Sequence, residues 1–403
     1  MSASTETLVK LRGLTSEART KGNVVVPTLQ TRKYKSQHSY NVRINKINAV
    51  NGVQLNGNYS FILPAFSQVV GEAWLEMTLP ALTDGTWKKH PMLNVVDRIT
   101  YRAGQKFFEF VPRKDMPILL NRCKDKAMKD QLMSLLKDHS GSASANAGTY
   151  ILPLVLPMSI WHTDRISEPI KHGNRAGGLW DAGRLADNLV IEVQFANRTN
   201  ATSAAASSFT TASNLGNVTL KWEEVVAAPA TIQAIKRDLP TYYCCEEYTR
   251  LDDQVADPTS MTVYKVASLV SRAGTTGFYF RARPAASVNC MSGAEHLKHI
   301  KVRCDGRDIY DTDSRPDDQR AYEKLLAGDP GAVGEPKFAH FQFGNAHQNF
   351  DAATVGSLLK NGACNELDLE LQTETGDDRI DIVAIHLRSF TFADGTVKVS
   401  NAY

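Results

Sequence analysis

The sequence lacks a long hydrophobic run. Its longest apolar stretch, residues 151–161, spans only eleven positions and contains Pro153 and Pro157. A membrane-spanning helix needs about 20 apolar residues. The N-terminal segment MSASTETLVKLRG also lacks the apolar core of a secretory signal. We therefore expect a chain that crosses no bilayer and that folds in a cytosol.

Cysteine is scarce, with 6 in 403 residues and no Cys-x-x-Cys spacing. Neighbouring residues such as Cys244 and Cys245 are poorly placed to bond each other. A cytosolic chain with so few cysteines is expected to keep them as reduced thiols. The pattern favours neither a disulfide scaffold nor a metal site.

The familiar catalytic motifs are missing too. No G-x-S-x-G, G-x-x-x-x-G-K-[ST], G-x-G-x-x-G or H-E-x-x-H occurs. The closest histidine pair, His296 and His299, would point to opposite faces of a strand, and adjacent acidic residues such as Asp317 and Asp318 diverge in the same way. We predict a protein that is not an enzyme and that needs no cofactor or metal.

Tryptophan is present five times and could in principle form a platform for sugars. Trp74 and Trp222 lie in alternating patterns and are predicted to be core residues. Trp161 and Trp180 flank a polar loop, where a role at an interface or in ligand binding stays open.

Net charge is small, because 46 Lys and Arg against 43 Asp and Glu leave +3. Residues 1–39 nevertheless contain seven basic side chains against Glu6 and Glu17, so that this segment is +5 and the rest of the chain is −2. Such a segment is typical of a charged interaction tail. We call residues 1–39 the basic arm, and its candidate contact residues are Lys10, Arg12, Arg19, Lys21, Arg32, Lys33 and Lys35.

Apolar residues mostly alternate with polar ones, which is typical of half-buried strands. Residues 59–63, 74–79, 189–195, 218–222 and 367–371 show this pattern. Helical signals are few. One begins at Asp115 and could run to residue 136, a shorter one follows Pro316, and a third ends before Pro240. The alternating pattern and the few helix signals therefore predict an all-β protein with a few short helices in its connecting loops.

The second half of the chain echoes the first. Each half contains a strand, a Gly turn, a second strand, and a Pro before an acidic helix start, and two further strands follow in the same order. The matching segments are 97–121 with 299–325, 186–198 with 364–376, and 217–229 with 379–392. We therefore predict two similar β-domains in tandem.

The expected boundaries are 1–39 for the basic arm, 40–239 for the first domain and 240–403 for the second. The domains would average about 180 residues, enough for eight strands with generous loops. This length fits a jelly roll, in which two four-stranded sheets pack against each other. The predicted fold is thus two tandem eight-stranded jelly rolls, or β-sandwich barrels.

Several segments then resemble one family, the double jelly-roll major capsid proteins of icosahedral viruses. This group includes those of nucleocytoplasmic large DNA viruses and tectiviruses, with adenovirus hexon as a distant member. The resemblance covers most of residues 40–403. It rests on YSFILP (59–64), VGEAWLEMTLP (70–80), the hairpin and helix of 97–121, YILPLVLP (150–157), NF (349–350), LDLEL (367–371) and IVAIHLR (382–388).

The resemblance implies a structural subunit that forms homotrimers, whose six barrels make a pseudo-hexagonal capsomer in the virion. It also implies assembly in the host-cell cytoplasm and contacts with neighbouring capsomers. The basic arm would lie on the inner side and contact a capsomer, a minor capsid protein, an internal membrane surface or the genome. A solvated, disordered arm is the alternative.

Two other functions remain open at this stage. One is a penton or spike protein built on the same fold, which copy number per particle would distinguish. The other is a tandem jelly-roll enzyme or lectin that acts on glycans, which metal analysis and glycan-array binding would distinguish.

Overall fold

The chain is described here from a computed structural model. It describes residues 33–35, 40–49, 52–64, 69–83, 85–122, 126–136, 148–159, 174–176, 179–203, 214–239, 241–255, 257–266, 275–284, 297–311, 339–342, 366–373, 378–393 and 395–401. Within these residues no helix is long and apolar enough to pass through a bilayer.

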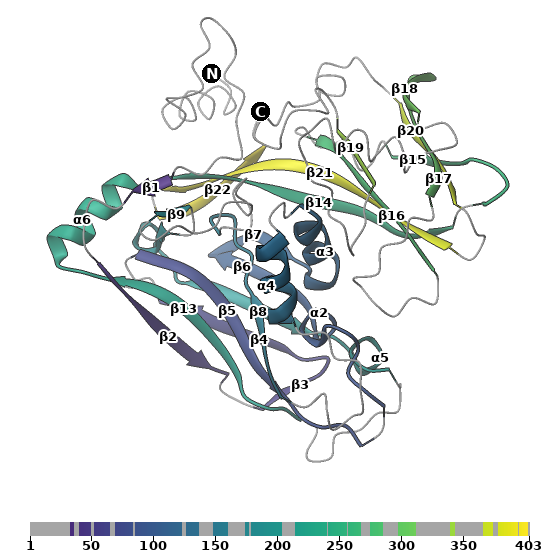
Figure 1. Ribbon diagram of the computed structural model, residues 1–403. Helices are drawn as coiled ribbons and strands as arrows, with labels where there is room; N and C mark the ends of the chain where they lie inside the picture. The colour runs from purple at the N-terminus through teal and green to yellow at the C-terminus, as the bar shows by residue number, and fades with distance from the viewer. Residues whose placement is uncertain are drawn as a thin grey trace, which may run out of the picture.

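Two antiparallel sheets form the first barrel (Figure 1). Its strands are β2 (Asn41–Asn48), β4 (Asn58–Leu63), β5 (Val69–Leu79), β6 (Val96–Ala103), β7 (Gln105–Phe110), β8 (Gly148–Pro153), β10 (Trp180–Asp181), β11 (Leu189–Phe195) and β13 (Val218–Val226). One sheet has the order β10-β5-β13-β2, with β8 also paired to β5, and the other has the order β4-β11-β6-β7.

The second barrel repeats this arrangement. Its strands are β14 (Tyr242–Val255), β15 (Thr262–Lys265), β16 (Thr275–Pro284), β17 (Leu297–Cys304), β18 (Arg307–Asp311), β19 (Ala339–Gln342), β20 (Leu367–Thr373), β21 (Asp378–Ala393) and β22 (Thr396–Asn401). One sheet has the order β14-β21-β16-β19, with β22 beside β21, and the other is β15-β20-β17-β18. The predicted pair of jelly rolls is therefore present.

The echoed segments occupy corresponding strands in the two barrels. Residues 97–121 contain the β6-β7 hairpin and 299–325 contain the β17-β18 hairpin, while β11 corresponds to β20 and β13 to β21. Both hairpins turn at a glycine in the left-handed region, Gly104 with φ 71° and Gly306 with φ 75°. Side chains with a Cβ rarely adopt this conformation, which explains why glycine recurs there.

Alternation places the predicted residues in the core of each sandwich. In β5, for example, Leu75 and Met77 are fully buried between the two sheets, and Trp222 of β13 is buried with them. Trp74 is an exception, because it lies on the opposite face of β5 and is only half buried. The prediction that Trp74 belongs to the core was therefore wrong. Neighbouring residues of a strand point to opposite faces, but alternation alone does not show which face an aromatic residue such as Trp74 occupies.

The helices lie in connections, as predicted. They are α2 (Pro91–Val95), α3 (Pro112–Arg122), α4 (Lys126–Leu136), α5 (Arg198–Ala201) and α6 (Pro229–Asp238), with a 3-10 turn η2 (Ala182–Arg184). The helix expected to begin at Asp115 begins at Pro112, because Pro is tolerated at the first helical position. The helix expected after Pro316 lies outside the described residues.

Helix α6 covers one end of the first barrel. Ile232, Ile235 and Leu239 pack with Val69 of β5 and Val225 of β13. Two short pairs complete the fold, β1 (Lys33–Lys35) with β9 (Asn174–Ala176) and β3 (Val53–Gln54) with β12 (Asn214–Leu215). Strand β1 falls inside the basic arm, so the last part of that segment pairs with the chain near the first barrel.

Two cysteines can be compared with the expected reduced thiols. Cys245 is a buried free thiol in β14. Cys304 at the end of β17 is disulfide-bonded. The prediction was therefore wrong for Cys304, because spacing along the sequence does not reveal which thiols a fold brings together.

Candidate functional site

We call the region where the two barrels meet the joint. It lies between β7 and α3 on one side and β14 and β21 on the other. Strands β14 and β21 have 14 and 16 residues and remain paired from Tyr242↔Thr391 to Val255↔Arg379. They are too long for the second barrel alone and extend over the first, where β22 continues the same sheet (Figure 1). One sheet of the second barrel therefore extends over the first barrel and packs against its core.

Aromatic side chains fill the joint. Phe107 and Phe108 of β7 contact Phe390 of β21 at centroid distances of 6.4 and 5.8 Å. Phe392 touches Phe107 at 6.0 Å, Trp180 at 5.9 Å and Tyr243 at 5.6 Å. Aromatic pairs at such distances contribute about 0.5–1.5 kcal/mol each beyond their burial. The core of the first barrel is thus completed by residues of β14, β21 and β22.

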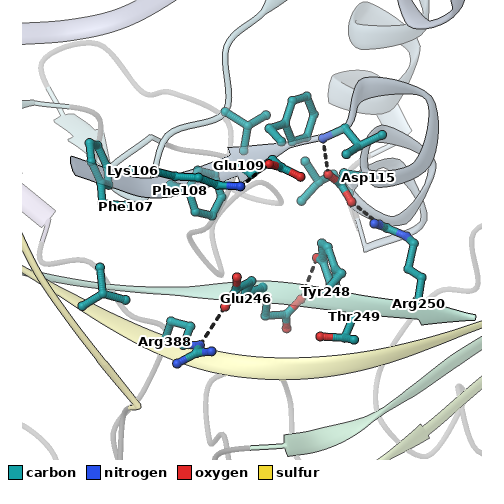
Figure 2. A pocket seen from close by; sticks show the side chains of 16 residues that line it. Lys106, Phe107, Phe108, Glu109, Asp115, Glu246, Tyr248, Thr249, Arg250 and Arg388 are labelled. Carbon is teal, nitrogen blue, oxygen red and sulfur yellow. Dashed lines mark hydrogen bonds and ion pairs between the residues drawn. The ribbon is translucent and has the colours of Figure 1, made fainter. Parts of the chain in front are cut away.

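Beside these aromatic residues lies a cavity of about 560 Å³ (Figure 2). Its upper wall comes from β7 and α3 and its lower wall from β14 and β21. The lining includes seven charged residues, which are Lys106, Glu109, Asp115, Glu246, Glu247, Arg250 and Arg388.

Ion pairs and hydrogen bonds engage most of these charged residues, and the pair of Asp115 with Arg250 ties the two walls together. The carboxylate of Asp115 accepts a hydrogen bond from the Val111 backbone N–H at 2.5 Å and pairs with Arg250 across the joint. Burial raises the pKa of Asp115, and the Arg250 guanidinium opposes that shift. Lys114 pairs with Asp252 nearby. One helix is therefore fixed to β14 by two charge pairs.

The lower wall carries its own contacts. Arg388 Nε donates to Glu247 at 2.7 Å, and the Tyr248 hydroxyl donates to Glu246 at 2.9 Å. The lining contains no His, Cys or Ser. Within the described residues no group of three or more His, Cys, Asp and Glu side chains could hold a metal ion. The arrangement suits a structural joint that fixes the angle between the barrels.

The residues singled out in the sequence lie elsewhere. Five of the seven basic arm residues lie outside the described part of the chain, and Lys33 and Lys35 belong to β1. Their proposed contacts stay a prediction. Trp180 is buried in the joint, which gives it an interface role within the chain, while Trp161 lies outside the described residues. His299 pairs with Asp311.

Comparison with solved structures places this architecture among known proteins. Capsid protein VP54 of the virus PBCV-1 superposes with a TM-score of 0.64 at 11% identity, covering 91% of this chain and 98% of VP54. The Faustovirus major capsid protein gives 0.52 at 10% identity, covering 96% and 98%. A chain of the Sputnik virophage gives 0.54 at 9% identity, covering 96% and 91%.

The fold is the double jelly roll of viral major capsid proteins. No family model and no curated protein matches the sequence, so the double jelly roll is recognised here from strand topology. Since 91% and 96% of this chain are covered in these two comparisons, the likeness is not confined to one of the two barrels.

Sequence reasoning found the barrels but missed the joint. A signal was present in Phe107-Phe108, because two consecutive apolar residues in a strand point to opposite faces. Both are buried. A strand that buries both faces must be covered on both sides, as is also true of Ile382 to Ile385 in β21.

Proposed function

We propose that this protein is the major capsid protein of an icosahedral virus and that three copies form a pseudo-hexagonal capsomer. The observation that carries this proposal is the complete double jelly roll, which covers 98% of both VP54 and the Faustovirus major capsid protein. Three copies of a doubled domain supply six barrels, and six barrels fit a lattice in which each capsomer has six neighbours.

The function of the protein would be to build a shell through contacts in which subunits bury part of their surface against one another. Stable interfaces of this kind commonly bury more than about 2,000 Å². Closed sandwiches suit the role because they leave only short strand edges that could pair with a wrong partner. In this proposal the protein resides in the virion, assembles in the host-cell cytoplasm and contacts neighbouring capsomers.

The mass of the purified protein in solution tests the proposal. We expect a stable species at three times the monomer mass of 44.4 kDa, measured by light scattering after size exclusion, with a hexagonal outline in negative-stain images. A strict monomer over a wide concentration range would contradict the capsomer.

The basic arm is proposed to contact an inner partner, which could be a neighbouring capsomer, a minor capsid protein, an internal membrane surface or the genome. Deleting residues 2–32 spares β1 and should leave the trimer mass unchanged. Particle formation should fail or fall several-fold, because the positive charge near the inner face is lost. Counting particles by electron microscopy measures the effect.

A matched full-length variant separates charge from length. In it Lys10, Arg12, Arg19, Lys21 and Arg32 become glutamine. If contacts of the basic arm are electrostatic, this variant should behave like the deletion. Normal particle yield from the deletion would refute the role of the basic arm.

A further inference from the structure

The cavity of the joint is large enough to hold a small molecule. Its volume of about 560 Å³ falls within the range of about 300–1,000 Å³ that is typical of ligand sites. Ligand sites often form where two domains meet, and this cavity lies between the two barrels (Figure 2). The chemistry of its lining therefore decides which class of ligand could bind there.

The upper wall offers an apolar and aromatic surface. Phe107, Phe108 and Phe110 of β7 line the cavity with three aromatic side chains, and all three residues are buried. Leu119 of α3 and Val155, which follows β8 in the chain, add aliphatic groups to the lining. The apolar body of a ligand would lie against these side chains and leave water, which favours binding.

The lower wall offers a buried carboxylate. Glu246 of β14 lines the cavity and is only 4% exposed. Its side chain accepts a hydrogen bond from the Tyr248 hydroxyl at 2.9 Å. The two oxygens of a carboxylate can accept about four hydrogen bonds in total. A donor group of a ligand inside the cavity would therefore meet an acceptor on this wall.

The lining as a whole is negative. Four of its charged residues are acidic and three are basic, which leaves a net charge of −1. Attraction between opposite charges is stronger where protein replaces water. The lining therefore favours a cationic ligand over an anionic or neutral one of the same shape.

One aromatic ring of the cavity already contacts a cation. The guanidinium of Arg250 lies over the ring of Tyr248, at 5.5 Å from its centroid. Aromatic faces attract cations through the charge distribution of the ring, and the attraction is larger when both groups have lost water. Aromatic rings opposite a buried carboxylate are suited to an ammonium group, which can donate hydrogen bonds to the carboxylate and lie against the rings.

The cavity also has a side that contacts solvent. Val399 of β22 lines the cavity and is 43% exposed, and the side chain of Lys106 on β7 is exposed as well. Glu246 and Phe110, in contrast, are almost completely buried. A ligand would therefore enter beside Val399 and Lys106 and place its charged group at the deeper end.

We propose that the cavity of the joint binds a small organic amine. Its ammonium group would pair with Glu246, and its apolar body would pack against the phenylalanines of β7. Such a ligand touches both walls, so it binds only while the two barrels are docked and stabilises the joint by mass action. This inference goes beyond the capsomer, because it assigns a ligand to each single chain.

Three probes of similar shape test the charge of the ligand. Phenethylammonium is a cation, 2-phenylethanol is neutral and phenylacetate is an anion. Calorimetric titration of the full-length protein at neutral pH should give a Kd of about 1 mM or lower for phenethylammonium. The other two probes should bind at least about tenfold more weakly, because neither can form a charge-assisted hydrogen bond with Glu246. Equal affinity for the three probes, or no binding of phenethylammonium at about 10 mM, would refute the site.

Two substitutions test whether the probe binds in the cavity. Glu246→Gln keeps the shape of the side chain and removes its charge, so phenethylammonium should bind about tenfold more weakly. Val399→Trp should weaken binding to a similar extent, because the larger side chain would occupy the entrance. Since Val399 is partly exposed, this variant should fold even if Glu246→Gln does not. Unchanged affinity in both variants would show that the probe binds elsewhere and would refute the site.

Each of these variants has a matched control. Glu370→Gln removes the charge of a glutamate that is paired with Arg303 in the second barrel, and Val263→Trp enlarges a valine that is 51% exposed. Neither Glu370 nor Val263 lines the cavity. Both controls should bind phenethylammonium like the wild type. The probe should raise the melting temperature of the wild type and the controls but not that of the two cavity variants.

The outcomes also separate a free amine from a lysine of the basic arm, and the ligand site from the proposed function. Deleting residues 2–32 should leave the affinity for phenethylammonium unchanged. Binding that becomes about tenfold tighter after the deletion would show that a lysine of the basic arm occupies the cavity, and would refute a site for a free amine. A trimer that binds no probe would refute the ligand site alone. A monomer that binds phenethylammonium would refute the capsomer and support the ligand site.

Discussion

Replacing Phe392 with alanine is expected to lower the free energy of unfolding by about 3–5 kcal/mol and to loosen the two barrels from each other. Phe392 is buried and contacts three aromatic residues, Phe107, Trp180 and Tyr243. Its loss would leave a cavity where β21 crosses the first barrel. Calorimetry should show one cooperative transition for the wild type and a split or broadened one for the variant.

Phe280→Ala is the matched control. Phe280 is equally buried but stacks on Phe278 inside the second barrel. Its removal should cost a similar free energy and lower the transition of the second barrel without opening the joint. Hydrogen exchange at Phe107 and Phe108 distinguishes the variants, since only Phe392→Ala should increase it. A cost below about 1 kcal/mol for Phe392→Ala would contradict a packed joint.

Replacing Asp381 with alanine is also expected to lower the free energy of unfolding, by about 3–5 kcal/mol, because two guanidinium groups would lose their shared partner. Asp381 in β21 accepts hydrogen bonds from Arg281 at 2.7 Å, from Arg283 at 3.0 Å and from the backbone N–H of Asp253 at 3.1 Å. Asp381 and Arg281 are both buried. Denaturant unfolding measures the change.

Asp308→Ala serves as the comparison. Asp308 also pairs with two cations, Lys301 at 2.9 Å and Arg303 at 3.0 Å, but its side chain is 43% exposed. Exposed pairs contribute about 0–1 kcal/mol. Similar losses of unfolding free energy for Asp381→Ala and Asp308→Ala would refute the prediction that breaking the buried ion pair costs more than breaking the exposed one.

The same carboxylate should make stability depend on pH. Burial alone would raise the pKa of Asp381, but Arg281 and Arg283 outweigh burial and hold that pKa below its ordinary value. The folded state therefore binds the proton less tightly than the unfolded chain. The stabilisation is complete above about pH 4, the ordinary aspartate pKa, and is lost as the pH falls through the folded value. Asp381→Asn should flatten this acidic limb.

The barrels themselves could be predicted because their signals are local. Alternation identified β5 and β11, and the recurring Gly104 and Gly306 turns aligned the two halves. Each signal depends on residues close together in sequence, where side-chain direction follows from strand geometry.

The joint could not be predicted in the same way. It brings Phe107 beside Phe392 and Asp115 beside Arg250, which are separated by 285 and 135 residues. Alternation shows which faces of a strand are apolar but not which distant strand covers them. Trp180 illustrates the limit, since its aromatic partner Phe392 lies in β21, far along the chain.

The sheet that extends from the second barrel over the first also sets an order for folding during synthesis. Tyr243, Phe390, Phe392 and Val397 belong to the core of the first barrel, yet all four follow that barrel in the sequence. A nascent chain that has released only residues up to 239 would leave Phe107, Phe108 and Trp180 open to water. Such a surface invites chaperones or aggregation. The core of the first barrel would therefore be completed only after the ribosome has synthesised β21 and β22, which come last in the sequence.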